Sequence, residues 1–257
     1  MRVEAVKTRL VRAGEISLID FVLESVKDLP DESIVVVSSK VVSLCESAIV
    51  PNPDGKISKE DLVKQDAEYW LPKEFSDVGY SFAIKYGVLA SSAGIDESNG
   101  DGNFVLWPRD PFRSANQIRA TLQQRFNHQK IGVIISDSTC LPNRRGTIGV
   151  MIAWSGFEPL DDLRETRVDL FGRPFKTTVM GIANGLAASA NVVMGEGTDA
   201  PRGVAIISEI DFVKFVEHNP TADEIKNVIM DKNQDIYAPF FNLAPWQKGD
   251  CGIILSI

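Results

Sequence analysis

Three acidic clusters of this sequence lie in turn-forming stretches, where side chains and backbone can converge on a ligand. They are GIDESNGDG at 94–102, SDST at 136–139 and MGEGTDAPRG at 194–203. Carboxylate, hydroxyl and amide oxygens are the ligands that Mg²⁺ and Mn²⁺ prefer. Asp96, Asp137 and Glu196 are therefore candidates to hold such a cation together. Taken singly, each carboxylate has a structural alternative, as the cap of a turn or as a solvated surface charge.

Asp137 comes just after the apolar run IGVII, with Ser136 between them, and this run predicts a buried strand. We therefore expect its carboxylate at the carboxyl end of that strand, where ligand sites of α/β-type sheets often gather. Such a position would fix a metal ligand rigidly.

The segment Gly195-Glu196-Gly197-Thr198 follows an apolar, small-residue stretch that is typical of a helix. Its glycines allow a sharp turn with consecutive backbone N–H groups exposed to a phosphate. Glycine at a helix end is also the commonest C-cap, which is the structural alternative. The segment matches neither a Walker A loop nor the dinucleotide-binding fingerprint.

Arg144 and Arg145 come shortly after Asp137 and precede a glycine. Each guanidinium can donate two parallel hydrogen bonds, which suits a phosphate or a carboxylate. The alternative is a solvent-facing turn. Sequence alone leaves both readings open.

The cysteines and histidines carry no recognisable catalytic or zinc motif. Cys45, Cys140 and Cys251 are odd in number and widely spaced, which fits reduced thiols better than a disulfide framework. With only His128 and His218 available, a histidine-rich metal cluster is excluded. Any metal must be held mainly by oxygen.

The composition is that of a folded globular protein, with 44% hydrophobic and 24% charged residues. A formal charge of −8 argues against a nucleic-acid binder. No run approaches the ~20 apolar residues of a membrane span, and the first residues lack the apolar core of a signal peptide. We therefore expect a cytoplasmic protein with no membrane and no nucleic-acid partner.

The elements that must position these residues are short and mixed. Hydrophobic periodicity and turn residues predict strands or extended segments at 1–6, 33–37, 82–90, 104–107, 131–135, 148–154 and 204–207, and helices at 17–26, 59–69, 114–126, 185–194 and 221–230. Because strands occur both paired and separated by helices, we expect an α+β fold. Residues 1–257 would form a single catalytic unit, with PNPDGKIS at 51–58 as the best surface linker between two interleaved parts.

The ordered blocks VVSSKVVSLCE, SSAGIDESN, a strand ending in SDST, NRRGTIGV, DLFGRPF and MGEGTDAPRG resemble the coenzyme F420-0:γ-glutamyl ligase family. The resemblance spans residues 1 to about 210. It implies two intertwined α+β subdomains with mixed or antiparallel sheets, a homodimer, and a site for GTP or ATP with two ions of Mg²⁺ or Mn²⁺.

The resemblance also implies roles for individual residues. Asp96 and Asp137 would bind one metal ion, and Ser138 and Glu196 the second. Arg144 or Arg145 would stabilise the transferred phosphoryl group. The implied nucleotide contacts are Ser39, Lys40, Asn99, Met194, Gly195, Glu196, Gly197, Thr198 and Asp199.

The implied reaction adds L-glutamate to a carboxylate of coenzyme F420-0 through an acyl phosphate. The chain departs from the family pattern at 7–9, 44–47 and 140–143, which suggests a divergent branch. One alternative is therefore γ-glutamyl ligation onto a folate or another pterin. An alternative of another class is a noncatalytic regulator that binds nucleotide and metal.

Overall fold

The computed structural model describes residues 1–196 and 201–250. Its strands are β1 (Arg2–Val6), β2 (Ser33–Ser38), β3 (Ile49–Pro51), β4 (Tyr69–Leu71), β5 (Phe82–Lys85), β6 (Val88–Ser91), β7 (Asn103–Val105), β8 (Ile131–Cys140), β9 (Thr147–Ser155), β10 (Leu160–Asp162), β11 (Val179–Gly181), β12 (Val204–Ser208) and β13 (Gln247–Lys248). Its α-helices are α1 (Leu18–Ser25), α2 (Ser39–Cys45), α3 (Lys59–Asp66), α4 (Pro111–Phe126), α5 (Ile182–Met194), α6 (Ala222–Val228) and α7 (Ala238–Phe241). The predicted α+β class is confirmed.

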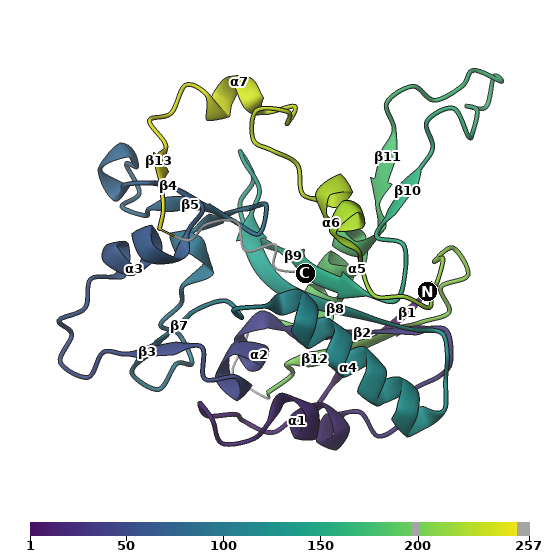
Figure 1. Cartoon of the computed structure of the whole chain (residues 1–257), viewed down its shortest axis with the longest axis horizontal. Helices are drawn as coiled ribbons and strands as arrows, with labels where there is room; N and C mark the ends of the chain where they lie inside the picture. Colours follow the sequence, from purple (N-terminus) through teal and green to yellow (C-terminus); the bar gives the residue numbers. More distant parts are fainter. Residues whose placement is uncertain (197–200, 251–257) are drawn as a thin grey trace.

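The main sheet has five strands in the order β1-β12-β2-β8-β9. Only β2 and β8 pair in parallel, and the other neighbours are antiparallel. Alternate side chains of β2 and β8 enter two different cores, as the two-residue period of a strand requires. Val35 and Val133 pack with α1 and α4, whereas Val36 and Ile134 pack with α5. The sheet is thus covered on both faces, with α4 in front of it in Figure 1.

A second sheet, in the order β13-β4-β5-β6, is built from the segment between α2 and α4 together with the far C-terminal strand. A third core, which contains Leu62, Val63 and Trp70, lies between this sheet and α3. The short ribbon β3-β7 connects this region with the main sheet. Residues 52–58 form a largely exposed turn between β3 and α3.

The ribbon β10-β11 extends away from both sheets, as Figure 1 shows. Leu170 and Phe171 lie in the long loop that connects its strands and are 100% and 89% exposed. The strands of this ribbon were not predicted from the sequence. No helix in the described ranges is both long and apolar enough to cross a membrane.

The extended segment expected at 82–90 is instead the pair of strands β5 and β6, joined by a turn at 86–87. Two further expected boundaries were also wrong. The helix expected at 59–69 ends at Asp66, because Tyr69 and Trp70 pair with β5. The strand expected to end at Ile135 continues to Cys140, because β9 pairs with it as far as Thr147. In both cases pairing with a neighbouring strand outweighs the local propensity of the sequence.

Candidate functional site

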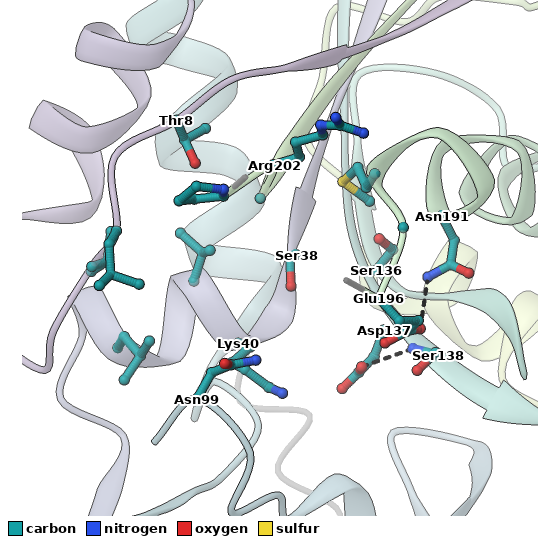
Figure 2. A pocket seen from close by; sticks show the side chains of 18 of the residues that line it. Thr8, Ser38, Lys40, Asn99, Ser136, Asp137, Ser138, Asn191, Glu196 and Arg202 are labelled. Carbon is teal, nitrogen blue, oxygen red and sulfur yellow. Dashed lines mark hydrogen bonds between the residues drawn. The ribbon is translucent and has the colours of Figure 1, made fainter. Parts of the chain in front are cut away.

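One cavity of about 260 Å³ opens beside the end of the parallel pair β2 and β8. Five separate segments of the chain contribute to it. They are residues 8–11, the end of β2 with the first turns of α2, the 96–99 loop, the middle of β8, and the end of α5 with residues 201–203. Figure 2 shows Asp137, Ser138 and Glu196 together on one side of the cavity, with Lys40 and Asn99 opposite.

The cavity brings together most of the residues that the sequence singled out. Those lining it are Lys40, Asp96, Asn99, Asp137, Ser138, Met194, Gly195 and Glu196. Gly197, Thr198 and Asp199 lie outside the described residues.

Three predicted residues lie elsewhere. Ser39 is almost fully buried and donates a hydrogen bond to Asp137 from behind the cavity wall. Arg144 and Arg145 are exposed in the loop between β8 and β9 and are not among the described residues that line the cavity. Their assigned roles stay predictions.

Asp137 lies inside β8 and not at its carboxyl end, so that expectation was wrong. It does lie one residue past Ser136, the last partner of β2 in the parallel register. From there on no described strand pairs with β8 on the β2 side. The cavity thus lies at the carboxyl end of β2, beside the middle of β8.

The Asp137 carboxylate accepts three hydrogen bonds. Oδ2 accepts them from the hydroxyl of Ser39 (2.8 Å) and from the indole N–H of Trp107. Oδ1 accepts one from the backbone N–H of Ser138 (2.8 Å). Burial raises the pKa of Asp137, and these hydrogen bonds with the charge of Lys40 oppose that rise. All three donors are neutral, so they orient the carboxylate without cancelling its charge.

Asp96 lies in the loop after the 3-10 helix Ser92–Gly94, held by backbone hydrogen bonds in both directions with Val105 (3.0 and 2.8 Å). Its Oδ2 accepts from the Lys40 ammonium and from the Ser98 hydroxyl (2.6 Å), and its Oδ1 accepts from the Ser98 backbone (2.9 Å). Burial acts to raise the pKa of Asp96, but the hydrogen bonds from Lys40 and Ser98 outweigh it and lower the pKa to about 2. Asp96 is thus a carboxylate at neutral pH.

The structural alternative holds for the first residue of the glycine-rich segment. Gly195 ends α5 with a φ of 69°, and its N–H donates to the carbonyl of Asn191 (2.8 Å), so it is a helix C-cap. It also lines the cavity. Glu196 is exposed there, and its carboxylate lies 3.5 Å from the Asn191 side-chain amide.

Sequence reasoning missed several residues that line the cavity, above all Arg9 and Arg202. Arg9 pairs with Glu15, and with Glu24 at 3.6 Å, whereas Arg202 makes no ion pair with any described residue. The signal for Arg202 was available, because it belongs to the block MGEGTDAPRG. Nothing in the local sequence around Arg9 marks it, since only the fold brings the N-terminal segment to the site.

The described lining carries three basic and three acidic side chains, which are Arg9, Lys40, Arg202, Asp96, Asp137 and Glu196. Such a mixed lining suits a polyanion that arrives together with cations. In the described ranges no three His, Cys, Asp or Glu side chains form a preassembled metal cluster. The oxygen donors nevertheless fit Mg²⁺, which is usually held by one or two carboxylates plus substrate phosphates.

Comparisons with known proteins point to one family. A sequence model described as F420-0:Gamma-glutamyl ligase matches residues 5–209. The protein named Coenzyme F420:L-glutamate ligase from Methanothermobacter thermautotrophicus is 35% identical over 77% of this chain and 84% of its own length. Proteins of the same name from Methanocaldococcus jannaschii (35% identity, 70% and 75% coverage) and Methanopyrus kandleri (34% identity, 78% and 85% coverage) are similar. The chain therefore belongs to the F420-0:γ-glutamyl ligase family.

Proposed function

We propose that this chain is a γ-glutamyl ligase that uses a nucleoside triphosphate and divalent cations to add L-glutamate to a carboxylate of coenzyme F420-0. One observation carries the proposal. Asp96, Asp137, Ser138 and Glu196 come from three separate segments and line one cavity together with Lys40 and Arg202. Oxygen ligands for cations thus lie beside basic side chains that can bind a triphosphate. Enzymes of phosphoryl transfer combine these two kinds of group to neutralise the phosphate charge.

The metal assignment follows from the donor atoms. Asp96 and Asp137 are the carboxylates that would hold one Mg²⁺ or Mn²⁺, and Ser138 with Glu196 would contribute to a second. When bound, these ions would supply charge that neutralises the triphosphate and the transferred phosphoryl group. The low pKa of Asp96 favours its carboxylate form at neutral pH, and Lys40 is its ion-pair partner.

The nucleotide is proposed to be GTP or ATP, held by Lys40, Asn99 and the 194–201 segment. Arg202 joins these residues as a phosphate contact because it is a basic residue that lines the same cavity and makes no ion pair with any described residue. Arg144 and Arg145 are proposed as contacts to the transferred phosphoryl group from the β8-β9 loop, which begins three residues after the cavity-lining Ser138. Ser39 supports the site through its hydrogen bond to Asp137.

The acceptor carboxylate must be activated first, because direct attack by an amine would require oxide as the leaving group. In the proposed first step an oxygen of the acceptor carboxylate attacks the γ-phosphorus, and the nucleoside diphosphate leaves. In the second step the α-amine of glutamate attacks the carbonyl carbon of the acyl phosphate, the C–O bond to phosphate breaks, and the amine loses a proton. One acceptor oxygen therefore ends in the released phosphate.

We further propose a cytoplasmic homodimer. The β10-β11 ribbon supports this, because it extends from the protomer and carries exposed apolar side chains, Leu170 and Phe171. Light scattering of the purified protein tests it, with Phe171→Ser as the variant. A monomer at all concentrations would contradict the dimer.

The test of the ligase uses purified protein, L-glutamate, Mg²⁺ or Mn²⁺, GTP or ATP, and F420-0 labelled with ¹⁸O in its acceptor carboxylate. We expect mass spectrometry to find one added glutamyl residue and ¹⁸O in the released phosphate. A glutamylated product without ¹⁸O in the phosphate would exclude the acyl phosphate but keep the ligase. Nucleotide binding without any product would favour the regulator.

A further inference from the structure

Trp107 joins two parts of the candidate site. It is 2% exposed, lies two residues after β7, and donates its indole N–H to Oδ2 of Asp137. The same short segment holds Asp96, because the backbone of Val105 makes two hydrogen bonds with the backbone of Asp96. Residues 105–107 therefore fix the position of one acidic residue through the backbone and of the other through a side chain.

The indole itself has almost no room to move. Gly94 has a φ of +72°, and a Cβ at this position would lie 2.1 Å from Cε2 of Trp107. On another side the ring of Tyr86 stacks with the indole at a centroid distance of 6.3 Å and an interplanar angle of 16°. The Tyr86 hydroxyl lies 2.9 Å from the carbonyl oxygens of Pro108 and Arg109, which anchors the chain just beyond the tryptophan.

The orientation of a carboxylate is set by the donors on its two oxygens. At Asp137, Trp107 and Ser39 both donate to Oδ2, while Oδ1 accepts a single bond from the backbone of Ser138. Trp107 and Ser39 reach Oδ2 from separate elements, so loss of the indole donor would leave the Ser39 hydroxyl, which can rotate, as the donor to this oxygen. Partners of this kind orient metal ligands in many proteins, and their loss typically costs 10–100-fold in metal affinity.

We propose that Trp107 is a positioning residue that holds the carboxylate of Asp137 in the orientation in which it binds a divalent cation. This inference rests on the proposed function, since it assumes that Asp137 is a metal ligand. Trp107 itself touches neither substrate nor metal. Gly94 contributes to this positioning, because a side chain at residue 94 would overlap with the indole of Trp107.

The test compares two tryptophan-to-phenylalanine variants in the full-length protein. Trp107→Phe keeps an aromatic ring and removes the donor to Asp137. Trp70→Phe is the matched control, because the Trp70 indole N–H is buried in the third core without a hydrogen-bond partner among the described residues. The probe is Mn²⁺ alone, without nucleotide, followed by the electron paramagnetic resonance signal of the free ion.

We expect Trp107→Phe to weaken Mn²⁺ binding about tenfold and Trp70→Phe to leave it within about twofold of the wild type. Equal affinity of both variants would overturn the positioning role and leave the proposed ligase untouched. Failure of the wild type to bind Mn²⁺ alone would overturn the role of Trp107, because no metal position would then exist for it to maintain without nucleotide, whereas the metal requirement of the ligase is tested separately by chelation.

A second measurement keeps the inference testable if Trp107→Phe does not fold. The protein has four tryptophans, so ¹⁵N-indole labelling gives four side-chain N–H signals in the wild type. Phenylalanine variants of Trp70, Trp154 and Trp246 assign the Trp107 signal by elimination. We expect Mg²⁺ alone to shift it more than the other three. A Trp107 signal that does not respond to saturating Mg²⁺ would overturn the inference.

Discussion

The ammonium of Lys40 is hydrogen-bonded to Oδ2 of Asp96, and it lies 2.9 Å from the hydroxyl of Ser98. The contact connects the first turn of α2, which directly follows β2, with the loop after the 3-10 helix Ser92–Gly94. It is one cause of the low pKa of Asp96. The Lys40 ammonium thus lies where the proposed function requires a positive charge to balance a phosphate.

Lys40→Met should raise the pKa of Asp96 from about 2 toward its ordinary value of 3.8 in metal-free protein. A lowered carboxylate pKa contributes stability that is complete above the unfolded-state pKa and is lost as the pH falls through the folded-state value. The variant should therefore be less stable than wild type at pH 6, with the difference vanishing toward pH 2. Urea unfolding with chelator present measures this.

The control for this prediction is Lys56→Met. Lys56 pairs with Asp54 at 3.2 Å on the surface, with exposed side-chain fractions of 82% and 68%. Exposed pairs contribute little, so this variant should match the wild type at both pH values. A difference for Lys40→Met that is the same at pH 6 and pH 2 would show that it does not come from Asp96.

Asp137→Asn should abolish most turnover and leave a folded protein. The amide keeps the shape of the carboxylate but lacks the charge that would bind a cation. Its oxygen can accept from Trp107 and Ser39, and its NH₂ then faces the backbone N–H of Ser138, a clash of donors that costs about 1–3 kcal/mol. Steady-state rates and thermal unfolding measure the two effects, with Asp162→Asn in the exposed pair with Arg164 as control. Turnover at the wild-type rate would exclude Asp137 as a metal ligand.

Arg145→Lys should impair turnover although it keeps the positive charge, because lysine cannot make a bidentate contact with a phosphoryl group. Arg144→Lys tests the neighbouring guanidinium, which is the second candidate. Kinetics of both variants at saturating nucleotide decide between them. If both variants turn over like the wild type, the pair is a solvated turn, as its exposed position in the β8-β9 loop would then suggest.

Arg202→Ala should raise the KM for the nucleotide about 10–100-fold, because a hydrogen bond to a charged group contributes about 1.5–3 kcal/mol. Arg173→Ala is a suitable control, since Arg173 is exposed in the loop of the β10-β11 ribbon. An unchanged KM for Arg202→Ala would remove this residue from the proposed nucleotide site.

The sequence predicted the main elements because they depend on local patterns. The β-branched run at 33–37 and the helical pattern at 114–126 correspond to β2 and α4. Asp96 and Asp137 could be found because each lies in a polar block next to a short apolar run. The fold class followed from the mixed order of elements.

The rest depended on contacts that no local pattern records. Arg9 lines the cavity because β1 and β12 pair and bring the N-terminal segment to residues 201–203, where Thr8 N–H donates to the carbonyl of Pro201 (2.9 Å). The partnership of Trp107 and Asp137 joins residues 30 positions apart. The extension of β8 through SDST was missed because polar residues there keep strand pairing only with β9 alongside.

Removal of divalent cations should abolish turnover, because the proposed ligands are carboxylate and hydroxyl oxygens without clustered thiolate or imidazole. Dialysis against a chelator, followed by addition of Mg²⁺ or Mn²⁺, should remove and then restore activity. Retention of full turnover after exhaustive chelation would contradict the metal requirement.

The last prediction concerns the acceptor, and it starts from the contrast between the assembled cavity and the altered segments of the sequence. Residues 8, 9 and 44 line the cavity together with Asp96, Asp137 and Glu196, and they lie in the segments 7–9 and 44–47, which are expected from the sequence to differ from the family pattern. We expect phosphoryl-transfer chemistry to be kept and recognition to differ.

The measurement is a panel assay with F420-0 and a reduced folate, each with ATP and with GTP, followed by mass spectrometry for an added glutamate. F420-0 should give the highest kcat/KM, with the folate second. The true acceptor should differ from the other in kcat/KM more than in affinity, because binding energy from its remote parts positions the reacting carboxylate. Asp137→Asn serves as the inactive control with every pair. If neither acceptor gains glutamate while nucleotide and Mn²⁺ bind, the ligase proposal loses its support and a binding role for the cavity remains.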